Sequence, residues 1–101
     1  MPAYVIFNEA ISDPAAMESY VAKAGPTVAA HGGTLRIASG AVDVIEGEWH
    51  GNHTVMLEFE SVDAATAWYQ SEEYQAVAPE RFAAAVTNAA IFEQFEMPGA
   101  S

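Results

Sequence analysis

The sequence predicts an α+β domain in which helices cover one face of an antiparallel sheet. Stretches with period-two apolar alternation are separated by stretches with the three-to-four-residue apolar spacing of amphipathic helices. The order is strand, helix, strand, strand, broken helix, strand. The 101 residues are 51% hydrophobic and 17% charged, which is enough for one core and too short for two domains. We therefore expect a single domain over residues 1–96 and a short tail over 97–101.

The first strand and the first helix are read from apolar pattern and capping. Tyr4–Glu9 is rich in β-branched and aromatic residues. Asp13 is placed to cap the following helix, with Pro14 at its first position. The expected buried face of this helix consists of Met17, Tyr20, Val21, Ala24 and Val28. Pro26 predicts a kink or restart before the helix ends at His31-Gly32-Gly33.

The middle of the chain predicts a long hairpin. Thr34–Ala38 and Val42–Glu48 both have strand-like patterns, and Ser39-Gly40 indicates a bulge or bend between them. Residues 49–53 are expected to form the turn. Thr54–Glu60 then alternates apolar and polar residues as the returning strand.

The last third predicts a broken helix and a final strand. Ser61 is a good N-cap for Val62–Gln70, and Ser71 is a good N-cap for a second helical piece that restarts at Pro79. Thr87–Phe95 returns to a strand pattern. The complete order is the ferredoxin-like βαββαβ arrangement.

A chain of this length has nothing left to cover the second face of such a sheet. That face carries Arg36, Met56 and Glu58, a mixture too polar for an ordinary core. We therefore expect a homodimer whose two sheets pack face to face and enclose a partly polar cavity.

Charge and composition exclude several classes of function. Three Lys plus Arg stand against fourteen Asp plus Glu, a formal net charge of -11, which disfavours nucleic acid and anionic membranes as partners. The chain has no cysteine, so thiol chemistry is excluded. It has neither a membrane-length apolar run nor a signal-like start, and we expect a soluble, cytoplasmic protein. The motifs of serine hydrolases, nucleotide-binding proteins and zincins are absent from the sequence.

Several segments together match a known family pattern. They are Ala30-His31-Gly32-Gly33 with Arg36, Val44-Ile45-Glu46-Gly47-Glu48-Trp49, Leu57-Glu58-Phe59-Glu60-Ser61, Ala67-Trp68-Tyr69-Gln70-Ser71, Glu73-Tyr74-Gln75-Ala76 and Arg81. In this order they resemble the bacterial family called domain of unknown function 1330. The resemblance implies a dimeric α+β barrel, the fold of muconolactone isomerases, cofactor-independent monooxygenases of antibiotic biosynthesis and chlorite-dismutase-like haem proteins. It implies no particular reaction.

The first candidate site residues are Glu58 and Arg36. A carboxylate on the inner face of a dimer must be paired, hydrogen-bonded or protonated, and Arg36 is the obvious partner. Donors left free on the guanidinium would suit an anionic ligand. The alternative is a structural ion pair that fixes the dimer.

Glu46, Trp49 and His31 are further candidates. By alternation Glu46 points toward apolar surroundings, which would suit a general acid or base. Trp49 is placed to close one end of a cavity. The alternatives are a backbone-capping Glu46 and a Trp49 that is only a hydrophobic plug. His31 ends the first helix near the expected cavity mouth and is either a proton-transfer group or a structural histidine.

The broken helix supplies the remaining candidates. Arg81 is one of the few cations and is expected either to hold a ligand or to bond helix ends. We assign Trp68 to the core and treat Tyr69 and Tyr74 as ligand-binding donors. His50 and His53, near two glutamates, give only a weak metal-site pattern, and we predict neither a metal nor another cofactor.

The leading functional hypothesis is a small homodimeric protein that binds a small organic molecule, anionic or enolic, in a cavity either between sheet and helices or at the dimer interface. It would act on this molecule by proton transfer of the isomerase or lyase kind, without a cofactor. A second hypothesis is a non-catalytic ligand-binding or stress-associated dimeric module. A third is an antibiotic-biosynthesis-type or haem-dependent monooxygenase, for which His31 would be the axial ligand.

Overall fold

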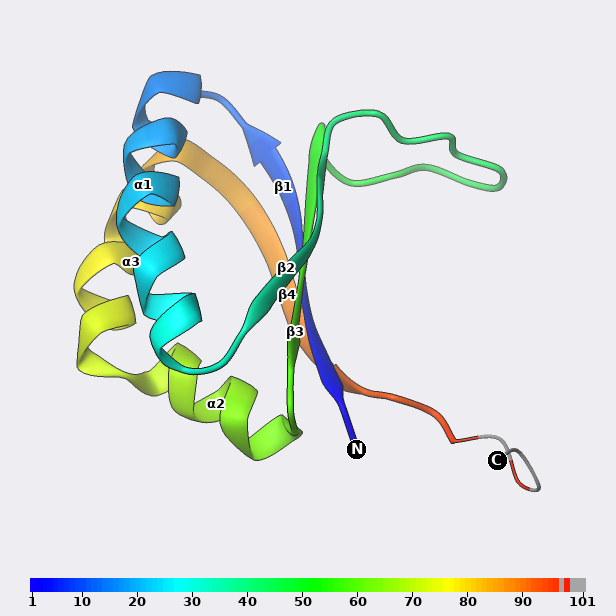
Figure 1. The fold of residues 1–101 in the computed structure, drawn as a ribbon. Helices are drawn as coiled ribbons and strands as arrows, with labels where there is room; N and C mark the ends of the chain where they lie inside the picture. Colours follow the sequence, from blue (N-terminus) through cyan, green and yellow to red (C-terminus); the bar gives the residue numbers. More distant parts are fainter. Residues whose placement is uncertain (97, 99–101) are drawn as a thin grey trace.

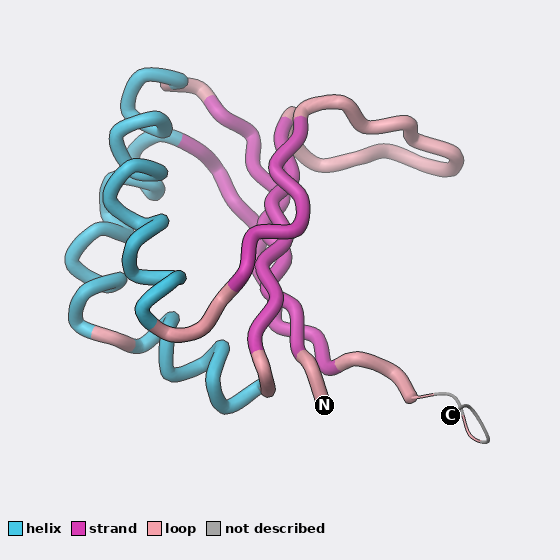
Figure 2. Tube along the Cα trace, viewed as in Figure 1, coloured by secondary structure: helices cyan, strands magenta, loops and turns pink. Residues whose placement is uncertain are grey.

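A computed structural model describes residues 1–96 and Pro98, so only Pro98 of the expected tail is described. The chain forms two layers, with helices on one side and a sheet on the other (Figures 1 and 2). The elements in chain order are β1 (Ala3–Ile11), α1 (Pro14–Ala30), β2 (Thr34–Ser39), β3 (His53–Phe59), α2 (Val62–Gln70), α3 (Glu72–Ala84) and β4 (Ala85–Glu93).

The sheet has the strand order β2-β3-β1-β4, and all neighbouring strands are antiparallel. This order and the element sequence confirm the ferredoxin-like α+β fold. Because side chains alternate along a strand, β1 turns Ala3, Val5, Phe7 and Glu9 toward the helices. The opposite face of the sheet has no covering element among the described residues, and we call it the open face (Figure 1).

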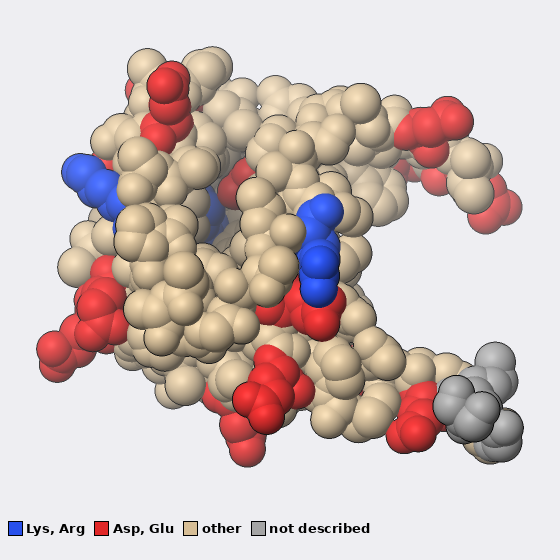
Figure 3. All heavy atoms as spheres, viewed as in Figure 1, with Lys and Arg blue, Asp and Glu red and all other residues tan. Residues whose placement is uncertain are grey.

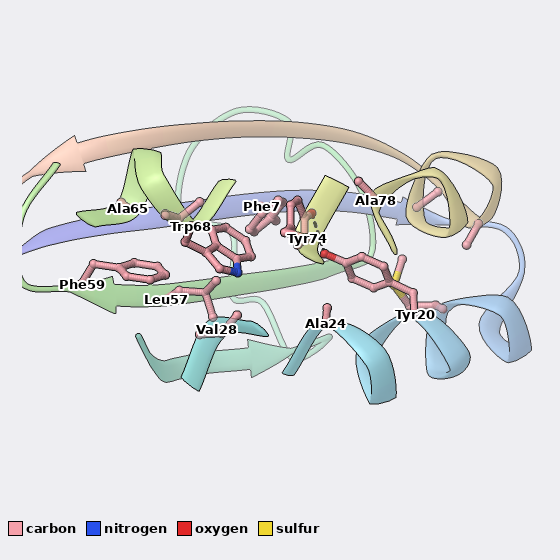
Figure 4. Close-up of a cluster of buried hydrophobic side chains, with 14 residues drawn as sticks. Phe7, Tyr20, Ala24, Val28, Leu57, Phe59, Ala65, Trp68, Tyr74 and Ala78 are labelled. Atoms are coloured by element: carbon pink, nitrogen blue, oxygen red, sulfur yellow. Dashed lines mark hydrogen bonds between the residues drawn. The ribbon is translucent and has the colours of Figure 1, made fainter. Parts of the chain in front are cut away.

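The core lies between the helices and β1 and β3, and Trp68 is at its centre (Figure 4). The Trp68 ring stacks on Phe59 with centroids 5.5 Å apart and lies 4.2 Å from the ring of Tyr74. Phe7 meets it edge-on at 6.3 Å. The indole N–H donates to Thr27 Oγ1 of α1 at 3.0 Å, so the one buried polar group of this residue is satisfied.

The predicted caps are present, and the prolines do not interrupt the helices. Asp13 and Ser61 each accept a hydrogen bond from the first turn, as does Ser71 at the break between α2 and α3. Of the kink or restart predicted at Pro26, the restart was wrong, and so was the restart predicted at Pro79, because α1 and α3 each continue through their proline. A proline on the outer side of a helix removes one backbone hydrogen bond, and water can satisfy the freed carbonyl. The predicted buried face of α1 wrongly included Val21, which is exposed.

The predicted hairpin was too long. The β2–β3 ladder ends at the pair Ser39 and Thr54, so the predicted strand Val42–Glu48 is instead part of a connection without a strand partner. The expected bulge lies at Arg36, between Leu35 and Ile37, and not at Ser39-Gly40. This bulge turns Ile37 to the open face, opposite Met56.

The last strand begins two residues earlier than predicted and ends two residues earlier. α3 ends at Ala84 and β4 follows immediately, pairing Ala85 with Ile11 and Glu93 with Ala3. Pairing with the long β1 therefore draws Ala85 and Val86 into the sheet.

The connection of residues 40–52, which we call the arm, extends from the sheet on the side away from the helices (Figure 1). Its returning end is fixed to β1: Asn52 N–H donates to the Glu9 carbonyl, and Asn52 Oδ1 accepts from the Ile11 N–H. Gly51 has a φ of 82°, and a Cβ there would collide with the Glu9 carbonyl. The arm therefore depends on a glycine at this position.

We expect Gly51→Ala to lower the free energy of unfolding by clearly more than Gly47→Ala. Both glycines have positive φ, which costs about 1–2 kcal/mol for alanine. Gly47 has open space around it, whereas Gly51 meets Glu9 backbone atoms. Urea denaturation of the two variants measures the difference, and equal losses would contradict the close contact of the arm with β1.

Candidate functional site

A cavity of about 420 Å³ lies between α1 and the strands β2, β3 and β1. Its wall is mainly apolar and includes Met17, Val28, Leu57 and Trp68. The wall also includes Val21 and Leu35, which are 54% and 57% exposed, so the cavity is accessible at the edge between α1 and β2. Figure 3 shows the surface hollowed between the helical layer and the sheet.

An acid and an imidazole, Glu9 and His53, line this mainly apolar cavity. They are paired directly across β1 and β3, so the sheet register sets their contact. His53 Nδ1 lies 3.1 Å from Glu9 Oε1, and the Glu9 residue is only 2% exposed. An unpaired carboxylate would be costly in such a place, and the imidazole supplies its hydrogen-bond partner. With Nδ1–H donating to Glu9, the second ring nitrogen of His53 is left as an acceptor.

A second polar cluster adjoins the cavity at Tyr20, which also lines it. The Tyr20 and Tyr74 hydroxyl oxygens are 2.7 Å apart, and Arg81 Nε donates to the Tyr74 hydroxyl at 3.2 Å (Figure 4 shows the two tyrosines). Burial, with the neighbouring Tyr74, raises the pKa of Tyr20 far above its ordinary value. Tyr20 therefore keeps its proton.

Arg81 is buried to 3% exposure and is held mainly by aromatic rings. Its guanidinium carbon lies 4.9 Å from the Phe7 ring centroid, 5.0 Å from that of Phe82 and 5.9 Å from that of Tyr20. These contacts are cation–π interactions, which strengthen when the cation is removed from water.

The candidates Arg36 and Glu58 lie together on the open face, away from the cavity. Arg36 Nε donates to Glu58 Oε1 at 2.9 Å. Their side chains are 52% and 29% exposed, so as an isolated surface pair they contribute at most about 1 kcal/mol.

The structure does not bring Glu46 and His31 into this site. Glu46 is exposed in the arm, and the expected apolar surroundings are missing because the strand that would have aligned it with Val42 and Val44 is absent. His31 ends α1, with Nδ1 3.0 Å from the Thr27 carbonyl oxygen and Nε2 3.9 Å from Glu73. Its ring contacts are thus those of a helix end.

Trp49 returns from the arm to the open face. With Ile6, Asn8, Asn88 and Phe92 among its neighbours, it lines a hollow of about 300 Å³ over β1 and β4. Trp49 therefore lies on the face where the sheets of the expected dimer would meet, and not at the helix–sheet cavity.

Among the tyrosine candidates, Tyr74 is fully buried in the polar cluster, whereas Tyr69 is half-buried with its ring 5.4 Å from that of Tyr74. Glu9 and Tyr20 were not among the predicted site residues, and His53 was considered only in the weak metal pattern. The available signal was alternation: Glu9 continues the series Val5 and Phe7 on the core face of β1, where a carboxylate is unusual.

The histidines of the weak metal pattern have separate partners. His50 Nε2 contacts the Val86 carbonyl oxygen at 3.0 Å, whereas His53 pairs with Glu9. No group of three His, Asp or Glu side chains among residues 1–96 and Pro98 is arranged to hold a metal ion. Within the same residues, none of the helices has the length and apolar character needed to cross a membrane.

The sequence model of the family described as "Domain of unknown function (DUF1330)" matches residues 2–95. No curated protein matches the chain in sequence.

Solved structures with the same fold share little sequence identity. A protein of unknown function from Rhodopseudomonas palustris aligns with a TM-score of 0.73 and 18% identity, over 95% of this chain and 84% of that one. SnoaB, a cofactor-independent oxygenase from Streptomyces nogalater, aligns with a TM-score of 0.70 and 12% identity over 98% of both chains. A dimeric ferredoxin-like protein of unknown function from Jannaschia sp. CCS1 aligns with a TM-score of 0.68 and 13% identity, over 93% of this chain and 100% of that one. Identities this low establish the fold alone.

We expect the stability of the protein to fall as pH rises above about 10, the ordinary pKa of tyrosine. The unfolded chain then releases the Tyr20 proton while the folded chain retains it, so unfolding is favoured by about 1.4 kcal/mol per pH unit for this group. Denaturation series between pH 8 and pH 12 in the wild type and in Tyr20→Phe measure the effect. A slope unchanged by the substitution would contradict the assignment.

Proposed function

The chain belongs to the DUF1330 family, whose function is unknown. We propose that it binds a small, largely apolar organic molecule in the helix–sheet cavity. We propose further that His53 removes a proton from this molecule and returns it. The observation that carries this proposal is the contact of the buried Glu9 carboxylate with the half-buried His53 imidazole in a mainly apolar wall. We further propose that the protein acts as a homodimer joined through the open faces of its sheets.

The size and lining of the cavity support a compact ligand. Small-molecule sites are commonly about 300–1,000 Å³ with mainly apolar walls and a few polar groups, and this cavity, at about 420 Å³, lies near the lower end. The apolar wall suits a single ring or a short aliphatic chain. The exposed edges at Val21 and Leu35 offer an entrance.

The chemistry follows from the arrangement of the pair. Glu9 accepts the Nδ1 proton of His53, which fixes the imidazole tautomer and stabilises the cation formed when the other nitrogen takes a proton. His53 is then the base and Glu9 is its positioning residue. If His53 removes a proton from carbon next to a carbonyl, the electron pair moves to the oxygen as an enolate. Where a carbon–carbon double bond adjoins that carbon, the charge spreads over it as a dienolate, and return of the proton to the far carbon gives an isomer without a co-reactant.

The test is exchange of solvent deuterium into small keto, enolic and lactone compounds, followed by NMR. We expect exchange with at least one such compound, and a loss of about 100-fold or more in His53→Gln and in Glu9→Gln. His50→Gln is the matched control, since that imidazole bonds a backbone carbonyl instead.

Rates that survive both substitutions would refute the proton-transfer role. Binding of these compounds without exchange would indicate the second hypothesis, a non-catalytic ligand-binding module.

The open face supports the homodimer. It carries exposed apolar side chains that a monomer would leave in water, including Ile37, Val86 and Phe92, with the Arg36–Glu58 pair among them. The arm extends from the same side of the sheet and holds Ile45, which is 90% exposed. Structural neighbours from Bacteroides fragilis, Jannaschia and Thermobifida fusca are described as dimeric. We assign Trp49 and the Arg36–Glu58 pair to this contact.

Light scattering at micromolar concentration is expected to give twice the chain mass, and Phe92→Asp is expected to give the chain mass. A charge placed in a dry interface is left without a partner, which disfavours association. Val21→Asp is the matched control, since Val21 is similarly exposed but lies on α1, on the helical side. A monomeric wild type, or dissociation by the control alone, would contradict the arrangement.

A further inference from the structure

The cluster of Arg81, Tyr74 and Tyr20 has more hydrogen-bond donors than acceptors. Arg81 is buried, yet no residue among 1–96 and Pro98 forms an ion pair with it. Its Nε donates to the Tyr74 oxygen, and that oxygen is 2.7 Å from the Tyr20 oxygen. Only one hydroxyl proton is needed between the two oxygens. The other has no acceptor among the described residues.

A guanidinium can only donate, so the Tyr74 oxygen accepts from Arg81. Between the two tyrosines either hydroxyl can donate. Accepting from a cation makes the Tyr74 hydroxyl a stronger donor, which favours donation from Tyr74 to Tyr20. In that arrangement the proton of Tyr20 is the free one, and Tyr20 is the member of the cluster that lines the cavity.

We propose that Arg81, Tyr74 and Tyr20 form a relay that presents a polarised hydroxyl to a phenolate or enolate oxygen of the molecule bound in the cavity. The inference rests on the proposed function, since it uses the same cavity, and it narrows the ligand class to molecules with such an oxygen. Tyr20 is the residue that touches the ligand, and Tyr74 and Arg81 are positioning residues.

The environment favours this role. The retained proton of Tyr20 keeps it a donor, because burial raises the pKa of the phenol. The aromatic rings of Phe7 and Phe82 keep the Arg81 guanidinium away from water. In this less polar environment its charge acts more strongly on the tyrosine hydroxyls. Fixed donors at a developing oxyanion are an effective form of transition-state stabilisation. His53 would generate the negative charge on the ligand oxygen by removing a proton, and the Tyr20 hydroxyl would stabilise that charge.

The test compares the binding of 4-nitrophenolate and 4-nitrotoluene. The two probes have the same nitro-substituted ring, but the first carries an oxygen anion where the second carries a methyl group. Isothermal titration calorimetry of the wild type is expected to give at least about tenfold tighter binding of the phenolate. Tyr20→Phe is expected to remove this advantage, and Tyr74→Phe to reduce it severalfold. Tyr4→Phe is the matched control, since its hydroxyl bonds Gln94 away from the cavity, and is expected to retain the advantage.

A measurement on the wild type alone accompanies the variants. Bound 4-nitrophenol is expected to have a lower pKa than the free probe, seen as phenolate colour persisting at lower pH, because the relay stabilises the anion. Equal affinities for the two probes with no such shift, or an advantage retained in Tyr20→Phe, would overturn the relay and leave the cavity intact. Failure of both probes to bind would overturn the proposed cavity function itself.

Discussion

The contact between Trp68 and the sheet holds the two layers of this fold together. The indole is stacked on Phe59 of β3 and is also in contact with Tyr74 of α3, while its N–H reaches Thr27 of α1. One side chain of α2 therefore links β3, α3 and α1. This packing sets the distance between α1 and the strands, and the cavity next to Trp68 is what that distance leaves open.

The architecture was predictable because it depends on local pattern. Caps at Asp13, Ser61 and Ser71 are short-range signals, and the structure contains each of them. Local pattern also explains the wrong prediction of a strand at Val42–Glu48. This segment does alternate apolar and polar residues, but a strand needs a pairing partner, and the β2–β3 ladder ends at Ser39. Pairing is a property of the folded sheet, which a local pattern cannot contain.

The candidate site was less predictable, because its groups meet only through register and packing. Glu9 and His53 are 44 positions apart and face each other because β1 pairs with β3 in one register. Tyr20 was predicted to be buried, but its contact with Tyr74 depends on how α1 packs against α3. Arg36 and Glu58 were predictable as a pair, since both belong to one hairpin. The sequence therefore indicated the local pair on the open face and not the long-range pairs in the cavity.

We expect a ligand to enter between the helices and the sheet, and the position of a bound probe tests this most directly. We expect intermolecular nuclear Overhauser effects from bound 4-nitrotoluene to the methyl groups of Val28 and Leu57, which line the cavity. Effects confined to Ile6 and Val86 would place the probe on the open face of the sheet, and this result would contradict the assignment of the site.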